Sequence, residues 1–354
     1  MSIRSHTNCK TFHFIIVSAF VVLIRNTVSE SDILFRNGWY KDDDDGPKYT
    51  ISNVPYIDSK VVPDSKYLQI KSRITTLYNG SVNNLLNVRT FKLVSCEILS
   101  IKSGAFLNLP NLTTLALNDN EIEHINNGVF NHLTIMRLFL HRNNIQSIDT
   151  EAFDNMPYLY MLKLNSNKLT MLDPNWFKKS PQLTDLYLRR NEITNIPSGA
   201  FKNIKGSHNI NGTETVDTKI FLSKNSINFI HPNAFQGLER LNQLWLDRNE
   251  LKHIEEMVFA GLDYVGVIFL SKNKLTGLPK NILSSLKMDL MTLDLAGNKN
   301  VSCLDYEIIS RVKITNLEKI HKLDCHCIDF LIRKLIEGGE DNEIKTDCEK
   351  DRTR

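Results

Sequence analysis

Residues Leu112–Ile125, LTTLALNDNEIEHI, contain the pattern that decides the fold of this chain. They follow the phrase L-x-x-L-x-L-x-x-N-x-I-x-x-I, in which Asn120 is the fixed polar position. The central L-x-L is a short strand, in which Leu115 and Leu117 point to one side and Ala116 to the other. One such segment cannot bury its own apolar side, so the pattern predicts that copies of it stack.

Copies of this pattern recur along most of the chain. Asparagines in the place of Asn120 follow one another about every 24 residues, but the interval between Asn191 and Asn225 is about ten residues longer. Two weaker copies come first, with Arg73 and Cys96 in the asparagine place. The asparagines are Asn120, Asn143, Asn167, Asn191, Asn225, Asn249, Asn273 and Asn298, and a parallel series consists of Phe106, Phe130, Phe153, Phe177, Phe201, Phe235 and Phe259.

The pattern resembles the leucine-rich repeat family in its extracellular form of about 24 residues per repeat. The resemblance covers roughly Leu68–Asn298. It implies an α/β solenoid, a horseshoe of about ten repeats over residues 67–300 with a concave parallel sheet. It also implies that the asparagines turn inward and that the phenylalanines form a spine on the convex side. Because the repeat pattern admits cysteine in the asparagine place, Cys96 is expected to be a buried free thiol.

The first 29 residues are typical of a secretory signal peptide. Arg4 and Lys10 precede the apolar run Phe12–Ile24, which is shorter than the ~20 residues that a membrane span requires. We therefore expect a secreted, extracellular protein without membrane insertion after cleavage. Arg25 directly follows the run, so an uncleaved anchor is the alternative. Without this segment the charges of the chain balance, which gives no global argument for binding nucleic acid.

Secretion predicts N-linked glycans and disulfide bonds. Acceptor sequons begin at Asn79, Asn111, Asn211 and Asn300. Residues 301–354 resemble the cysteine-rich C-terminal cap of the family, except that one cysteine lies upstream. The resemblance implies two disulfides among Cys303, Cys325, Cys327 and Cys348, with Cys325–Cys348 and Cys303–Cys327 as the first expectation. Zinc at Cys325-His326-Cys327 is the alternative.

The N-terminal flank, residues 30–66, lacks the paired cysteines that are common in N-terminal caps of the family. We expect a solvated linker with a short extended cap near Tyr56–Val62. The acidic run Asp42–Asp45 belongs to this linker, with a calcium site or a site for a cationic partner as the alternative.

The middle outward position of the repeated strand carries many aromatic residues. In successive copies it is Ala116, Phe139, Lys163, Tyr187, Phe221, Trp245, Phe269 and Asp294. Two interpretations remain open: the rings stack laterally across the sheet, or they form a ligand-binding surface on the concave face. Polar neighbours would then form its rim, among them Arg137, Arg189 and Asp247.

A basic series directly precedes the asparagines and would line one edge of the concave face. Its members are Arg142, Arg190, Lys224, Arg248 and Lys272. It is either a solvated edge or a docking strip for an acidic protein, a glycan or a lipid headgroup. The extra residues near Lys205–Glu214 form either a tolerated surface loop or a contact loop at the rim of that face.

No catalytic motif is present, so we expect neither enzyme activity nor a cofactor or metal. The resemblance extends to Toll-type receptor ectodomains and secreted arthropod immune proteins. It implies a receptor-like recognition protein that binds an extracellular protein ligand on its concave face, as a decoy or co-receptor in innate immunity. The alternatives are a matrix or adhesion component and a membrane-anchored receptor-like protein. The oligomeric state is not predicted.

Overall fold

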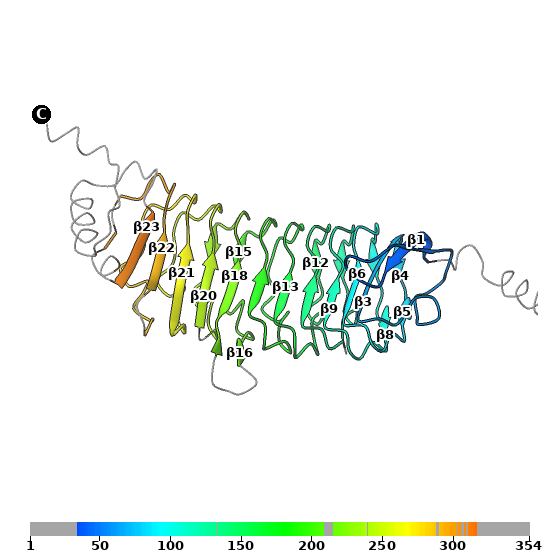
Figure 1. Ribbon diagram of the computed structural model, residues 1–354. Coiled ribbons are helices and arrows are strands. Elements are labelled where there is room, and N and C mark those ends of the chain that lie inside the picture. The colour runs from blue at the N-terminus through cyan, green and yellow to red at the C-terminus, as the bar shows by residue number, and fades with distance from the viewer. Residues whose placement is uncertain are drawn as a thin grey trace, which may run out of the picture.

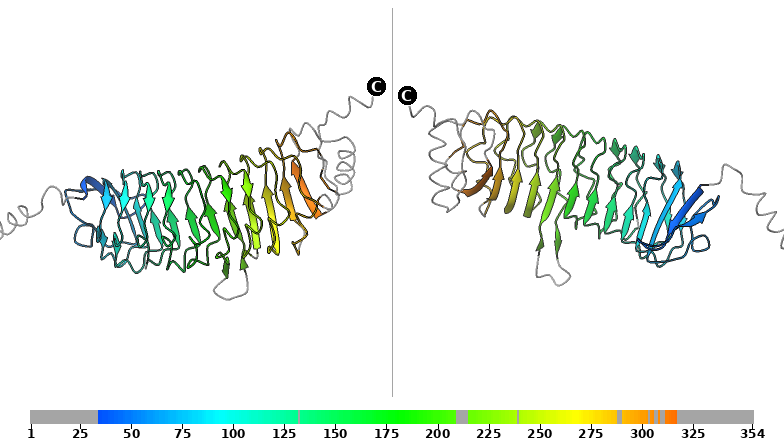
Figure 2. Two further views of the ribbon diagram at one scale, coloured as in Figure 1. Left: turned by 180° about the vertical axis from the view of Figure 1, so that it is seen from behind. Right: turned by 45° about the horizontal axis from the view of Figure 1, so that its top comes forward.

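The protein is an elongated, gently curved solenoid in which each turn contributes one strand to a long sheet (Figures 1 and 2). The computed structural model describes residues 34–131, 133–208, 215–238, 240–287, 290–302, 304–305, 308 and 311–316. The predicted signal peptide, the four cysteines of the predicted cap and the sequon asparagine Asn211 lie outside the described residues.

The main sheet has thirteen strands, and the pairings from β3 to β23 are parallel. The ten predicted repeat strands are all present in this sheet, from β3 near one end to β22 near the other, which confirms the predicted horseshoe. One further parallel strand, β23, lies in the segment expected to form the C-terminal cap. The strands are β1 Arg36–Lys41, β2 Tyr49–Ile51, β3 Tyr67–Arg73, β6 Thr90–Leu93, β9 Thr114–Ala116, β11 Arg137–Phe139, β13 Met161–Lys163, β14 Asp185–Tyr187, β18 Thr218–Phe221, β20 Arg240–Trp245, β21 Tyr264–Phe269, β22 Leu290–Asp294 and β23 Val312–Asn316.

In the described residues, the remainder of each turn consists of turns and two-residue strands with little helix. Four parallel pairs, β4–β7, β5–β8, β10–β12 and β15–β19, link one turn to the next. Their bounds are β4 Thr76–Leu77, β5 Val82–Asn83, β7 Ser100–Ile101, β8 Phe106–Leu107, β10 His124–Ile125, β12 Ser147–Ile148, β15 Asn195–Ile196 and β19 Phe229–Ile230.

The repeat asparagines form a buried ladder between turns, as the resemblance implied. Asn191 is 7 % exposed; its Nδ2 donates to the carbonyls of Leu164 at 2.9 Å and Leu188 at 3.0 Å, and its Oδ1 accepts from the N–H of Leu169 at 3.1 Å. The same three contacts recur at every repeat asparagine from Asn143 to Asn298. Because buried backbone groups need partners, this ladder satisfies the interior of each turn.

Phenylalanines form the predicted spine on the opposite side of the core. Phe153 stacks on Phe130 at 6.4 Å and on Phe177 at 6.1 Å between ring centroids, and Phe235 stacks on Phe201 at 5.5 Å and on Phe259 at 5.8 Å. Cys96 is 1 % exposed and its thiol is free, which confirms that prediction. Burial raises the pKa of this thiol, which disfavours the reactive thiolate.

The N-terminal flank forms a β-hairpin that caps the first turn. The expectation of a solvated linker is wrong for this stretch, because β1 pairs antiparallel with both β2 and β3. Phe35 and Ile51 are buried against the end of the core. The loop between β1 and β2 carries Asp44, whose carboxylate accepts from the Tyr67 hydroxyl at 2.5 Å and pairs with Lys92 at 3.3 Å. The hairpin therefore covers the apolar end that an uncapped solenoid would expose.

The extra residues form a second hairpin, β16 (Ser207–His208) and β17 (Thr215–Val216), which projects from the margin where the strands begin (Figures 1 and 2). The insertion leaves the main sheet in register, because Tyr187 still pairs with Phe221 across it. No helix among the described residues is long and apolar enough to cross a lipid bilayer.

Candidate ligand-binding face

Four aromatic side chains form a continuous stack on the outward side of the sheet. The ring centroids of Tyr187 and Phe221 are 4.4 Å apart, those of Phe221 and Trp245 are 5.9 Å apart, and those of Trp245 and Phe269 are 3.8 Å apart. The strand register requires this, because Tyr187, Phe221, Trp245 and Phe269 are direct partners in adjacent strands. All four side chains are half-buried, since each ring covers part of the next. Lateral stacking therefore occurs, and the remaining ring surface faces solvent.

Lys163 connects the remaining aromatic residue, Phe139, to this stack. Its Nζ lies 5.0 Å from the ring centroid of Phe139 and 5.2 Å from that of Tyr187. Both distances suit cation–π contacts. The six residues from Phe139 to Phe269 thus form one row across six strands, which we call the aromatic row: Phe139, Lys163, Tyr187, Phe221, Trp245 and Phe269.

Polar side chains flank the aromatic row on both sides. Arg137 and Asp185 are on the side where the strands begin, and Gln243 accepts a hydrogen bond from the Trp245 indole at 3.1 Å. Arg189 and Asp247 are on the side where the strands end, and Arg189 is exposed. The structure thus places the predicted rim residues beside the rings, in the arrangement of an apolar centre with a polar border.

His141 lies on the same side as Arg189 and makes an edge contact with Phe139 at 6.3 Å between ring centroids. Its Nδ1 is buried without a hydrogen-bond partner. Burial lowers the pKa of His141, because the charged form would lose its hydration there.

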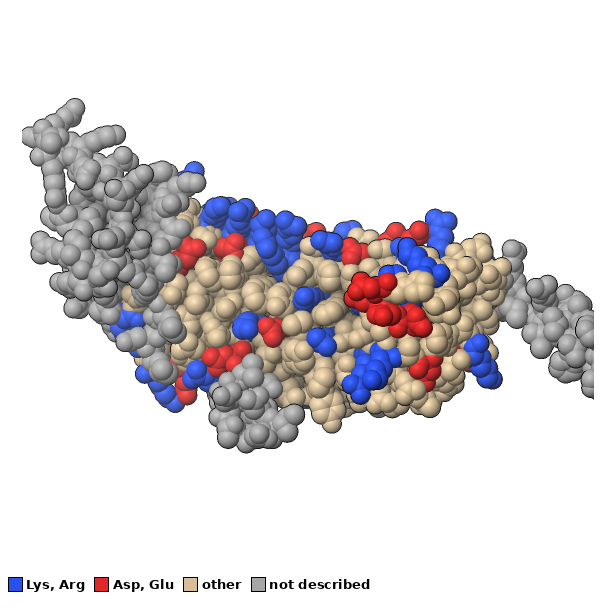
Figure 3. Space-filling view, in the orientation of Figure 1, with Lys and Arg blue, Asp and Glu red and all other residues tan. Residues whose placement is uncertain are grey.

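The basic series lies one position further along each turn, where the backbone is left-handed. Arg142, Arg190, Lys224, Arg248 and Lys272 have φ angles of 55°, 57°, 56°, 56° and 56°. Arginine and lysine do not predict this conformation, because the left-handed region favours glycine or asparagine. Figure 3 shows Lys and Arg side chains gathered along the upper margin of the C-terminal half, where the strands end.

The structure separates Arg142 from the other members of the series. Arg142 pairs with Asp119 at 3.4 Å. Arg248 has only a distant pair with Asp247, at 3.9 Å. The pKa of Lys224 is lowered, first by the charge of Arg190 and then by burial and by Arg248 and Arg189. Lys224 is therefore surrounded mainly by other positive charges, and the opposing effect of Asp247 on its pKa is smaller.

A separate groove of about 660 Å³ lies between the N-terminal hairpin and the first turns. Its lining includes Tyr56, Arg73, Tyr78 and Asn79.

The predicted glycan acceptors among the described residues are exposed. Asn79 and Asn300 are exposed, as glycan acceptors must be, and Asn111 is exposed as well, but its Nδ2 donates to the Leu86 carbonyl at 2.7 Å. Within the described ranges, no three His, Cys, Asp or Glu side chains converge as a metal site would require.

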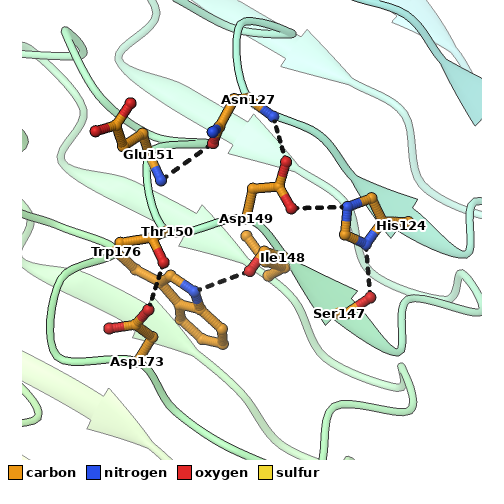
Figure 4. A network of polar contacts seen from close by, with 9 residues as sticks. All are labelled: His124, Asn127, Ser147, Ile148, Asp149, Thr150, Glu151, Asp173 and Trp176. Atoms are coloured by element: carbon orange, nitrogen blue, oxygen red, sulfur yellow. Dashed lines mark hydrogen bonds and ion pairs between the residues drawn. The ribbon is translucent and has the colours of Figure 1, made fainter.

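A polar network on the side away from the main sheet joins neighbouring turns (Figure 4). His124 contacts the Ser147 hydroxyl at 2.6 Å through Nδ1 and Asp149 at 3.0 Å through Nε2. These are the residue types of a hydrolase triad. Here, however, the second oxygen of Asp149 accepts the Asn127 N–H at 2.9 Å, and Asn127 in turn accepts the Glu151 N–H at 3.1 Å. Each contact holds one turn to the next, so we assign the network to the structure of the solenoid.

The fold and this face together define a solenoid that presents a long, accessible sheet surface. The leucine rich repeat model matches residues 86–138, 134–193, 218–251 and 239–299, which is more than half of the chain. The protein therefore belongs to the leucine-rich repeat family. No curated protein matches the sequence.

Two solved structures are similar to this chain. One is the TLR13–ssRNA13 complex, with a TM-score of 0.52 and 23 % identity, covering 70 % of this chain and 42 % of the other. The second is the Toll–Spatzle complex, a hub in Drosophila development and innate immunity, with a TM-score of 0.53 and 18 % identity, covering 75 % and 40 %. The chain thus spans less than half of each neighbour. At these identities the likeness shows a shared fold alone.

Proposed function

We propose that this protein is a secreted, receptor-like recognition protein that binds an extracellular protein ligand on its concave face. The observation that carries the proposal is the row of half-exposed rings from Tyr187 to Phe269 with its polar border. Interface hot spots favour Trp and Tyr in such surroundings, because a large apolar area is covered at a small entropic cost. A role in innate immunity, as a decoy or co-receptor, is part of the proposal.

A protein ligand is favoured over a nucleic acid, although one similar structure is a complex with RNA. Single-stranded nucleic acids bind by stacking bases on free aromatic faces. In this row the rings of Trp245 and Phe269 are 3.8 Å apart, and those of Tyr187 and Phe221 are 4.4 Å apart. Neighbouring rings already cover most of these ring faces, and the edges that remain suit apolar side chains. The Toll–Spatzle complex supports a protein ligand by analogy of fold.

The test is affinity capture from the extracellular fluid of the source organism. The wild-type protein is compared with the Trp245→Ala/Phe269→Ala variant, after circular dichroism shows that both are folded. Loss of two hot-spot side chains should weaken a specific partner by at least about 2 kcal/mol, or roughly 30-fold. A matched control, Tyr78→Ala/Tyr158→Ala, removes two exposed rings outside the main sheet and should retain the partner.

Equal capture of the same partners by all three proteins would reject the concave face as the binding surface. Recovery of the protein mainly from insoluble matrix would favour the structural or adhesive alternative. Sequencing the N-terminus of the mature protein tests secretion, because a chain that begins near Ser29 has lost its signal peptide, whereas an intact Phe12–Ile24 run favours the membrane-anchored alternative.

A further inference from the structure

Four cations occupy equivalent places in four successive turns of the C-terminal half. They are Arg190, Lys224, Arg248 and Lys272, and we call them the basic ladder. The backbone N–H of each one donates to a carbonyl of the next turn, at distances of 3.0, 3.0, 2.8 and 2.6 Å. Their backbones are therefore fixed one strand spacing apart, about 4.8 Å, so that the ladder is roughly 14 Å long.

The backbone does not demand long cationic side chains at these places. The equivalent positions in other turns are Ser95, Asp119, Arg142, Ser166 and Gly297, with a left-handed φ as well, and four of these five are not cations. For a residue other than glycine this conformation costs roughly 1–2 kcal/mol, and asparagine or aspartate adopts it more readily than arginine or lysine. The cations occupy four strained positions in a row, so the fold alone does not explain their presence.

Neighbouring acids neutralise little of the charge of the basic ladder, and its one ion pair within the described part of the chain, between Arg248 and Asp247, is long at 3.9 Å. Among the described residues, no carboxylate forms an ion pair with Arg190, Lys224 or Lys272, and Arg189 adds a further positive charge beside them. In the N-terminal half, by contrast, Lys92 pairs with Asp44. The cations of the basic ladder therefore give this margin of the concave face a positive charge that attracts an anionic partner.

We propose that an extended acidic segment of the protein ligand lies across these four turns, with its carboxylates on the basic ladder and an apolar side chain on the Trp245–Phe269 rings. This inference rests on the proposed function, because it names the ligand chemistry of that face. Five extended residues span about 14 Å from first to last, with side chains at alternate positions on one side. Three carboxylates at alternate positions therefore match the length of the ladder.

A uniform polyanion, such as a nucleic acid or a sulfated glycan, fits this surface less well. The carboxylate of Asp247 lies between Trp245 and Arg248 in the chain, and it is only 17 % exposed. It would repel a phosphate or sulfate chain that crosses from the ladder to the rings. A peptide in which acidic and apolar side chains alternate can place an uncharged side chain beside Asp247, so that it avoids this repulsion.

The experiment measures binding of a fluorescent peptide with glutamate at alternate positions and tyrosine beside the central one. The variant Arg190→Asn/Lys224→Asn/Arg248→Asn removes three ladder charges, and asparagine keeps the left-handed backbone. The control Lys102→Asn/Lys178→Asn/Lys202→Asn removes three exposed charges outside the main sheet. We expect the ladder variant to bind the peptide at least tenfold more weakly than wild type and control, and to lose most of the salt dependence.

Unchanged binding by the ladder variant would overturn the inference. So would a heparin fragment or a single-stranded RNA oligonucleotide that binds the wild type more tightly than the peptide and is lost in the variant. In the capture experiment, a partner lost from the Trp245→Ala/Phe269→Ala variant but retained by the ladder variant rejects this inference and keeps the proposed function. A partner retained by both variants rejects both.

Discussion

At the scale of single residues, one asparagine per turn connects the backbone of its own turn to that of the preceding turn. Each side-chain amide of the asparagine ladder donates two hydrogen bonds to, and accepts one from, buried main-chain groups. Leaving such groups without partners costs about 1–3 kcal/mol each. The fixed asparagine of the repeat is therefore required by the interior of the turn, and the position before it is available for other purposes.

The Asn191→Ala variant should lower the free energy of unfolding by at least about 3 kcal/mol, because three buried backbone groups lose their partner. The control is Asn195→Ala, a half-buried side chain whose single contact, with the Thr194 hydroxyl, is 3.5 Å long. That change should stay within about 0.5 kcal/mol. Urea unfolding followed by circular dichroism measures both. Equal unfolding midpoints for the two variants would contradict a stabilising role of the asparagine ladder.

At the scale of elements, the turns differ in how closely they approach one another. Gly237 and Gly261 follow equivalent phenylalanines in adjacent turns, with φ angles of 93° and 87°. A Cβ at Gly237 would lie 2.6 Å from the carbonyl oxygen of Lys202, whereas at Gly261 the nearest atom is 3.6 Å away. The turn that follows the inserted hairpin is thus pressed against the turn before it.

Gly237→Ala should cost about 2–4 kcal/mol of stability, since a steric clash adds to the left-handed backbone strain. Gly261→Ala has the strain without the clash and should cost about 1–2 kcal/mol. Thermal unfolding of both variants separates the two contributions. If the melting temperatures fall equally, the close approach at Gly237 contributes nothing.

The sequence predicted the elements that repeat, and it failed where the chain departs from the repeat. Periodic leucines and asparagines determine the strands and their register, so the row of Tyr187, Phe221, Trp245 and Phe269 was expected. The β1–β2 hairpin has no repeat signature, and its acidic loop resembled a linker. The pairing of Arg142 with Asp119 and the cation–π contacts of Lys163 depend on distances between turns, which one sequence does not contain.

At the scale of the whole molecule, each turn contacts chiefly its two neighbours, so stability is transmitted along one axis. The ends are the weak points of such an arrangement. At the N-terminal end, Phe35 is fully buried between the hairpin and the first turns. It is the largest apolar side chain that the cap inserts into the core.

Phe35→Ala should open the N-terminal end alone, because the cavity it leaves costs about 3–5 kcal/mol next to a terminus. Hydrogen exchange should then accelerate in β1, β3 and β6 while β14 keeps its protection. Phe153→Ala, in the middle of the spine, serves as the comparison and should reduce protection on both sides. Uniform acceleration in the Phe35→Ala variant would show that the solenoid unfolds as one unit.

The hairpin β16–β17 has a practical consequence for the study of this protein. It leaves the solenoid at the margin opposite the basic ladder, and the sheet keeps its register across the insertion. Loops that tolerate extra length add little to the cost of folding. The hairpin is therefore an attachment point for a dye or an epitope tag on the margin opposite the basic ladder.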